Sequence, residues 1–215
     1  IFVDEIISEV FKLFSPDIPL KLLPTQYIGF SPEHKGFAGT ISLPSNLITS
    51  MIKEVGGQLS EMGFKRLILL NGHGGQISLL NTAARELRSF SPGMAVFPCF
   101  LWSGVNGLKE LLTKNEIEDG LHASLAETSL MLALKPELVG DERPNDGIKG
   151  PIPEGWSLEG NAPTAWLTDD FSQSGVIGDS RGANECLGKN LKGLLVNHWF
   201  KLIMNLMQSD WPNNS

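Results

Sequence analysis

Residues 67–80, LILLNGHGGQISLL, decide the fold, because they join a short apolar run to a helical one through a glycine-rich turn. With Arg66, the first half reads RLILLN, which is short, apolar and continuous and therefore predicts a buried strand. The second half continues with helical spacing to Phe90, and MAVFPCFLW at residues 94–102 predicts another strand. This alternation predicts an α/β fold in which a mostly parallel sheet lies between helices.

Four more helices are predicted around this unit. One covers DEIISEVFKLF at residues 4–14, and a second begins at Ser45 as N-cap and is closed by Gly63 as C-cap. A third runs near residues 124–134, and the last begins around Gly182. Its predicted inner face comprises Leu187, Leu191, Leu194, Leu195, Trp199, Leu202 and Leu206. Between these two helices, residues 136–182 are rich in Pro, Gly, Asp and Asn and predict a long irregular excursion that lines a pocket.

The bulk composition is that of an ordinary globular domain. The chain has 215 residues, 41% hydrophobic and 19% charged, which fits a single domain. No apolar run approaches the roughly 20 residues that span a bilayer. The net charge of -7 argues against a nucleic-acid partner, since phosphate binding needs clustered cations. No nucleic acid and no membrane is therefore expected as a partner.

The two cysteines are distant from each other and form no disulfide or zinc pattern. Cys99, within an apolar strand, is expected to be a small core residue. The first residues show no signal-peptide features. These observations favour a reducing, cytoplasmic location.

His73 is the first candidate site residue, because it lies between glycines directly after the predicted strand. Ligands of open α/β sheets bind beyond the carboxyl ends of the strands. Gly74 and Gly75 would let the backbone approach a ligand or metal closely. The alternative is a glycine-rich turn with a solvent-facing histidine. No phosphate-loop motif and no HExxH zinc helix is present.

The second candidate group is His122 and Glu127, in LHASLAETSLMLAL. His122 lies just ahead of a helix and Glu127 in its first turn, so both can face the same mouth of the sheet. However, Ser124-x-x-Glu127 also matches a capping box, in which the Glu side chain turns back to the N-cap amide. A carboxylate used in that way would not easily reach a metal, so the two interpretations exclude each other.

Glu33 and His34, in GFSPEHKGFAGTISLP, form the third group. On an extended chain, adjacent side chains point to opposite sides, so only one of them is expected to face a cavity. A polar pair at the surface is the alternative. Trp156 and Trp166 lie in the irregular excursion and are candidates for a pocket wall. His198 is expected to be a packed or interface histidine.

Four segments, GFSPEHKGFAGTISL, LNGHGGQ, HASLAETSLMLAL and GVIGDSRGA, resemble the creatininase family in their order and spacing. The resemblance extends from about Asp4 to about Gly188. It implies a three-layer αβα sandwich, a centre of two divalent metal ions, usually zinc or manganese, and a homo-oligomer such as a hexamer. It also implies a small-molecule substrate, with hydrolysis of C–N bonds in small cyclic amides, formamides or short peptides by a metal-activated water.

The resemblance assigns roles to four residues. His73 matches the NGH metal histidine, and Glu127 matches the ETS glutamate that would bind the second ion, which favours a ligand role over the capping box. His122 matches a histidine that acts in proton transfer. Asp4 resembles the carboxylate that bridges both ions, although it is also a possible N-cap of the first helix.

Departures from the family pattern limit these expectations. The family carries a further Glu and His just upstream of the bridging Asp, so residues 1–215 are expected to form a single creatininase-like domain without that segment. Gln76 stands where the family commonly has Asn. Creatininases carry an aromatic residue and a carboxylate at the positions of Gly74 and Gly75, so creatinine itself is not the expected substrate. The alternatives are a non-catalytic binding or assembly module and a deformylase-like or peptidase-like member.

Overall fold

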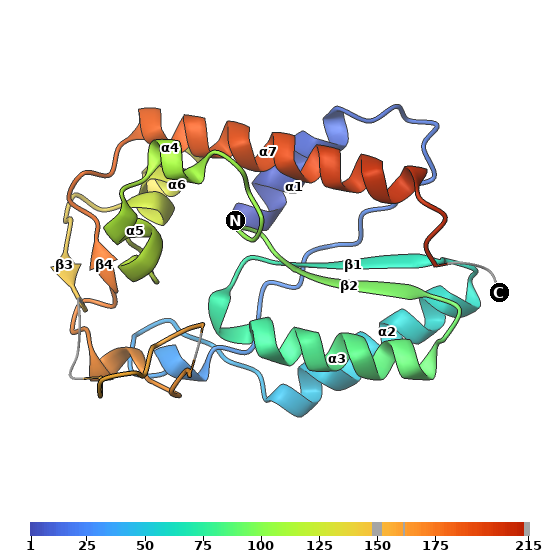
Figure 1. Ribbon diagram of the computed structural model, residues 1–215, viewed down its shortest axis with the longest axis horizontal. Helices are drawn as coiled ribbons and strands as arrows, with labels where there is room; N and C mark the ends of the chain where they lie inside the picture. The colour runs from blue at the N-terminus through green and yellow to red at the C-terminus, as the bar shows by residue number, and fades with distance from the viewer. Residues whose placement is uncertain (148–151, 161, 213–215) are drawn as a thin grey trace.

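The computed structural model describes residues 1–147, 152–160 and 162–212, and it has three layers (Figure 1). The central layer is a parallel pair of strands, β1 (Arg66–Asn71) and β2 (Ala95–Phe100). Helices α2 (Ser45–Glu61) and α3 (Ile77–Phe90) cover one face. Helices α1 (Phe2–Lys12) and α7 (Glu185–Gln208) cover the other. The predicted α/β class and αβα layering are confirmed.

The unit β1–α3–β2 forms the βαβ crossover predicted from the opening segment. The strands pair in register from Arg66 opposite Ala95 to Asn71 opposite Phe100. A single 3₁₀ turn, η2 (Gly74–Gln76), leads from the end of β1 into α3. His73 therefore lies at the carboxyl end of β1, as the sequence predicts.

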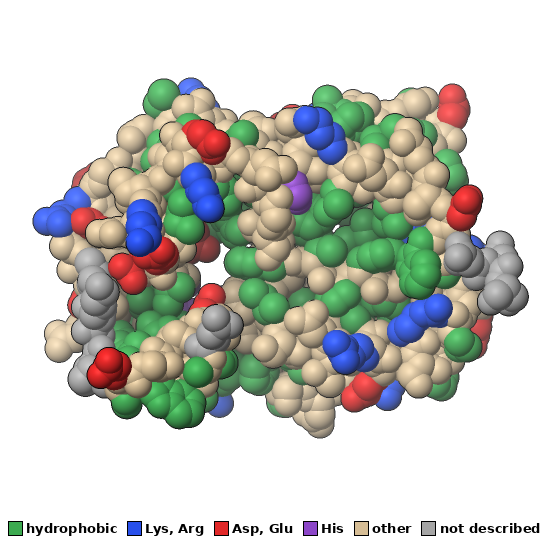
Figure 2. Space-filling view, viewed as in Figure 1, with side chains coloured by type: hydrophobic (Ala, Val, Ile, Leu, Met, Phe, Trp, Pro, Cys, Tyr) green, Lys and Arg blue, Asp and Glu red, His purple; other side chains and the backbone are tan. Residues whose placement is uncertain are grey.

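Alternate side chains of β1 enter two different hydrophobic cores, as the two-residue period of a strand requires. Ile68 and Leu70 pack against the core shared with α1 and α7, whereas Leu67 and Leu69 pack against the core of α2 and α3. Most residues of both strands are only partly buried. Figure 2 accordingly shows hydrophobic side chains at the level of the sheet, between the two helical layers.

Helix α6 (Leu125–Leu134) packs against α7, and the inner face of α7 differs from the prediction at one position. Leu202 is 42% exposed, and Ile203 is buried in its place. The prediction was wrong because the buried stripe follows a four-residue step through Leu191, Leu195, Trp199 and Ile203. The helix also begins at Glu185, three residues after the predicted start, because the Asn184 side chain caps it.

Small differences also occur at the ends of α2. Pro44 is the N-cap and Ser45 the first helical residue, so the prediction of Ser45 as N-cap was one residue late. Met62 is the C-cap, and Gly63 follows it with a left-handed φ of +93°. Glycine is favoured at this position because it adopts positive φ without a steric penalty.

The excursion between α6 and α7 is largely irregular, as predicted. Its short elements are η3 (Pro136–Leu138), β3 (Asn145–Asp146), η4 (Thr168–Asp170) and β4 (Gly178–Asp179). Two further short helices, α4 (Leu108–Leu111) and α5 (Lys114–Asp119), precede α6. Strands β3 and β4 pair antiparallel. In the described part of the chain, no helix combines the length and apolar character needed to cross a membrane.

Candidate metal centre

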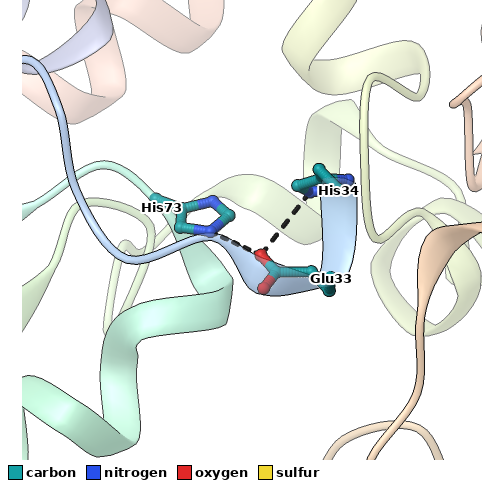
Figure 3. Close-up of side chains that lie close together, drawn as sticks. All are labelled: Glu33, His34 and His73. Carbon is teal, nitrogen blue, oxygen red and sulfur yellow. Dashed lines mark ion pairs between the residues drawn. The ribbon is translucent and has the colours of Figure 1, made fainter. Parts of the chain in front are cut away.

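Glu33, His34 and His73 bring three metal-ligand atoms within 4.8 Å of one another (Figure 3). Glu33 Oε1 lies 2.6 Å from His73 Nε2 and 3.7 Å from His34 Nε2. The side chains of Glu33 and His34 are only 10% and 12% exposed, and that of His73 is 29% exposed. Two imidazoles and a carboxylate equal the three protein ligands that catalytic zinc sites commonly use.

The convergence of Glu33 and His34 corrects two expectations. The two side chains were expected to point to opposite sides of an extended chain, or to form a polar pair at the surface. They instead lie on the single turn of a 3₁₀ helix, η1 (Pro32–His34). Consecutive residues of a 3₁₀ helix are rotated by about 120°, because the helix has three residues per turn. Both side chains can therefore face one buried point.

The turn that carries His73 is fixed by the side chain of Asn71, the last residue of β1. Asn71 Nδ2 donates to the His73 carbonyl at 2.7 Å, and the His73 amide donates to Asn71 Oδ1 at 2.9 Å. Asn71 is itself buried. The backbone of His73 is thus held by the last residue of the strand.

Gln76 connects this turn to the segment that carries Glu33 and His34. Its Nε2 donates to Asn71 Oδ1 at 2.8 Å, and its Oε1 accepts from the Phe30 amide at 3.2 Å. The side chain therefore spans two loops that are 46 residues apart in the sequence. Gln76 was noted in the sequence only as a departure from Asn, and its bridging role was missed.

The electrostatics around Glu33 favour an ionised carboxylate. Burial favours its neutral form, but the His73 ring, the local backbone and the Ser31 hydroxyl outweigh burial and hold the pKa of Glu33 at about 2. His73 Nε2 is buried, and although it lies close to Glu33, the angles are not those of a hydrogen bond. Among the described residues it has no hydrogen-bond partner. A buried nitrogen that faces a carboxylate without such a bond fits a shared cation.

Thr168 holds the far side of the His34 ring and was missed in the sequence. Its Oγ1 and His34 Nδ1 are hydrogen-bonded at 2.6 Å, and Thr168 is fully buried. Burial, with a contribution from His73, lowers the pKa of His34. Metal-binding histidines are commonly oriented by a partner on the second ring nitrogen. No local signal identifies such a partner, since Thr168 lies in the irregular excursion.

His122 adds a third imidazole. Its ring centroid lies 4.2 Å from that of His34, and the centroids of His34 and His73 are 5.7 Å apart. The backbone of His122 is paired with Ile177: the His122 amide donates to the Ile177 carbonyl at 3.2 Å, and the Ile177 amide donates back at 2.8 Å. Burial, helped by the neighbouring histidines, lowers the pKa of His122 to about 4. The ring is therefore neutral at pH 7.

Glu127 lies outside the Glu33–His34–His73 group. Its Oε2 accepts a hydrogen bond from the Ala123 amide at 2.7 Å, and burial raises the pKa of its carboxyl. The predicted capping box is wrong in detail, because the Ser124 hydroxyl donates to Glu116 at 2.6 Å and Glu127 reaches one residue beyond the N-cap. The role of Glu127 as a metal ligand stays a prediction.

Asp4 also lies outside this group. It is in the first turn of α1, whose N-cap is Ile1, so its interpretation as the N-cap was wrong. Its Oδ1 accepts a hydrogen bond from Thr25 Oγ1, and hydrogen bonding to Asp4 raises the pKa of Tyr27. Its role as a bridging carboxylate stays a prediction.

The remaining residues singled out in the sequence, Trp156, Trp166, His198 and Cys99, are not part of the Glu33–His34–His73 group. Trp156 is 57% exposed, whereas Trp166 packs edge-on against Phe171. Their roles in a pocket wall stay predictions. His198 packs edge-on against Trp199, as expected of a packed histidine. Burial raises the pKa of Cys99, which is partly buried beside the α1–α7 core.

Comparisons with known proteins show which family and which proteins the chain is similar to. The creatininase family model, described as creatinine amidohydrolase, matches residues 1–203. The mycofactocin precursor peptide peptidase of Mycobacterium tuberculosis (strain CDC 1551 / Oshkosh) is 27% identical over 201 residues, which cover 91% of this chain and 72% of that protein. The creatinine amidohydrolase of Pseudomonas putida is 29% identical over 152 residues, covering 63% of this chain and 58% of that protein.

Solved structures support the same fold. A creatinine amidohydrolase (creatininase) crystal structure superposes with a TM-score of 0.72 at 21% identity, covering 96% of this chain and 81% of that one. A manganese form of creatininase superposes with a TM-score of 0.71 at 22% identity, covering 96% of this chain and 82% of that one. Together with the family model, these likenesses show that the chain belongs to the creatininase (creatinine amidohydrolase) family.

Proposed function

We propose that this chain is a metal-dependent hydrolase that cleaves an amide C–N bond. The observation that carries the proposal is the Glu33–His34–His73 group, whose ligand atoms lie within 4.8 Å of one another and include a buried imidazole nitrogen without a hydrogen bond. Similarity to hydrolases of the same family supports it. Solved creatininases include Zn–Zn and Mn forms, which supports zinc or manganese as the metal.

Glu33, His34 and His73 would hold the metal through Oε1 and the two Nε2 atoms. A bound divalent cation supplies positive charge that polarises a carbonyl and lowers the pKa of water. For His34, we propose the tautomer in which Nδ1–H donates to the Thr168 hydroxyl, since this leaves Nε2 free on the side of Glu33. A second ion, as the family resemblance implies, needs donors beyond these three, and Asp4 and Glu127 are the predicted candidates.

His122 is the proposed proton carrier. Since its pKa is about 4, its imidazole is neutral at pH 7 and can accept a proton from the attacking water. The same ring nitrogen can then deliver that proton to the leaving nitrogen of the amide. The position of the ring, 4.2 Å from His34 between centroids, places it beside the metal-ligand group.

A peptide is the substrate class that the relatives favour, since a peptidase matches 91% of this chain. The glycines at positions 74 and 75 also differ from the aromatic residue and carboxylate expected in true creatininases. Cyclic amides and formamides are the alternatives within the same chemistry. A panel of short peptides, lactams and formamides therefore separates the three classes.

The test is hydrolysis of this panel before and after metal removal. We expect hydrolysis with zinc or manganese, loss after chelation, and recovery when the metal is restored. Glu33→Gln and His73→Ala should lose both metal and activity, whereas His198→Gln, an imidazole outside the site, should lose neither. Protein that holds metal fully but hydrolyses nothing on the panel would favour a non-catalytic binding module.

His122→Ala separates proton transfer from metal binding. We expect metal content to stay complete while turnover falls by about 10² to 10⁴, the usual contribution of general acid–base catalysis. Unchanged turnover at full metal content would show that His122 does not carry the proton.

We also propose that the chain forms a homo-oligomer, as the family resemblance implies. Several large apolar side chains are exposed and available for subunit contacts, including Tyr27, Phe90 and Met62. Light scattering during size-exclusion chromatography measures the mass directly. A mass of 23.4 kDa at micromolar concentration would contradict this proposal.

A further inference from the structure

The first turn of helix α1, which carries Asp4, lies against the turn that carries His73. A Cβ at Gly72 would be 2.9 Å from Val3 Cγ2, so any side chain at position 72 would push the helix away. Gly72 directly precedes His73, and Val3 directly precedes Asp4. The start of α1 is drawn beside the carboxyl end of β1 (Figure 1). Asp4 is therefore carried to the metal centre by the packing of its own helix.

Two hydroxyl groups bind the Asp4 carboxylate. Thr25 Oγ1 donates to Asp4 Oδ1. The Tyr27 hydroxyl is bonded to the same carboxylate, which raises the pKa of the phenol because its ionised form would face a negative charge. An ionised carboxylate has about four lone-pair sites, so two such bonds leave acceptor sites for a metal ion.

Both hydroxyls come from one extended segment, residues 25–31, which also reaches the metal centre. Further along it, the Phe30 amide donates to Gln76 Oε1 at 3.2 Å, and the Ser31 hydroxyl donates to Glu33 Oε1 at 3.1 Å. The segment thus contacts the first turn of α1 at one end and the metal-ligand group at the other.

The contacts to Asp4 are not needed to start the helix or to satisfy a buried charge. An acidic residue in the first turn already interacts favourably with the helix dipole. The Asp4 side chain is 31% exposed, so water can reach it. What the two hydroxyls do is restrict the direction of the carboxylate, and carboxylates that bind metals are commonly oriented by hydrogen bonds of this kind.

We propose that Thr25 and Tyr27 are positioning residues that hold the Asp4 carboxylate in the direction required to bind a divalent ion at the metal centre. The inference rests on the proposed function in one respect, the binding of metal, and on the ligand role that the sequence predicts for Asp4. Neither hydroxyl touches the metal in this arrangement.

Zinc titration of the full, metal-stripped chain by calorimetry tests the proposal. Asp4→Asn should lose one zinc ion and thereby identifies the ion that depends on this carboxylate. The double variant Thr25→Val/Tyr27→Phe should bind that ion about 10- to 100-fold more weakly, the range found when the supports of metal ligands are removed. Thr25→Ser keeps a hydroxyl and should bind zinc normally. Thr82→Val, which removes an exposed hydroxyl on α3 bonded to the Ser78 carbonyl, is the matched control and should also bind zinc normally.

The ring of Tyr27 provides a second readout, because Tyr27 is the only tyrosine in the chain. With isotope-labelled tyrosine, its ring gives a single set of resonances. These should shift when zinc is added, since the ion compensates the charge of the carboxylate to which the hydroxyl is bonded. In Asp4→Asn the same addition should leave them in place. A purely structural role for Tyr27 predicts no shift in either protein.

Two results would overturn the inference. One is complete retention of zinc by Asp4→Asn, and the other is a zinc affinity of the double variant equal to that of the unmodified chain. Metal-dependent hydrolysis of the substrate panel together with either result would leave the proposed function standing and remove the inference alone. If zinc binds as expected but nothing on the panel is hydrolysed, the proposed function fails and the positioning roles stand.

Discussion

Gly75 lies against the Glu33 carboxylate so closely that a Cβ at this position would be 2.2 Å from Glu33 Oε1. The same Cβ would be 2.7 Å from His73 Nε2. The glycine therefore provides the space in which the carboxylate meets the imidazole. The carboxylate of Glu33, which is distant in sequence, occupies the space that a Cβ atom at residue 75 would need.

Gly75→Ala should weaken metal binding, because the methyl group displaces Glu33 from His73. We expect zinc affinity to fall by about 10- to 100-fold, the range found when the supports of metal ligands are removed. Isothermal titration with zinc measures this. Gly74→Ala is the matched control, since its nearest neighbour, Glu159 Oε1, would be at an ordinary 3.7 Å. Equal losses in both variants would show that the space beside Glu33 is not what matters.

Gly188→Ala should destabilise the contact between α6 and α7. Its Cβ would lie 1.9 Å from the Ser129 carbonyl oxygen, so the helices would have to move apart, at a cost of roughly 3 kcal/mol. Gly193→Ala lies on the same helix and meets no described residue within 4 Å, so it should stabilise by up to about 1 kcal/mol. Urea denaturation measures both free energies. Similar effects of the two substitutions would contradict the close packing at Gly188.

Gln76→Ala should lower both stability and metal affinity, because the side chain joins the two loops of the metal centre. Two hydrogen bonds are lost, worth about 1 to 3 kcal/mol together. Gln76→Asn, which is one methylene shorter, should not restore the bridge. Thermal denaturation and zinc titration measure the two effects. Gln58→Ala removes only a surface contact and serves as the control.

Asp146 makes the stability of the excursion dependent on pH. Backbone amides of Ser174, Gln173 and Gly147 bind its carboxylate and hold its pKa at about 2. Since the unfolded value is about 3.9, the folded state favours the ionised form, and this stability is present above pH 4 and lost as the pH falls towards 2.

Asp146→Asn should therefore flatten the fall in unfolding free energy between about pH 4 and pH 2. Urea denaturation across this range compares the variant with the unmodified chain, and Asp17→Asn controls for the change in net charge. If the variant loses stability towards pH 2 as steeply as the unmodified chain, the amide contacts do not set the pKa of Asp146.

The sequence was sufficient for the elements with regular periodicity. The strand at Arg66–Asn71, the helix that follows it and the position of His73 at the strand end all follow from local pattern. The conformation of PEH was not predicted, because a single 3₁₀ turn has no periodic signal. The convergence of Glu33 with His34 depended on that turn and could not be derived without it.

Long-range side-chain contacts were also beyond the sequence. Thr168 meets His34 across 134 residues, and Gln76 meets Phe30 across 46. The spacing of Ser124-x-x-Glu127 suggested a capping box. Glu116, which lies on a different helix, makes the capping contacts instead, and the local motif gives no sign of it. Local spacing alone does not indicate which acceptor reaches an amide first.

The central claim is that Glu33, His34 and His73 bind one divalent cation. Anomalous diffraction at the zinc absorption edge, from crystals of the protein grown with zinc, tests it most directly. The account predicts a peak about 2.0 to 2.2 Å from Glu33 Oε1 and from the Nε2 atoms of His34 and His73. A zinc ion bound elsewhere in the intact fold, with Glu33 and His73 in direct contact and no peak between them, would contradict it.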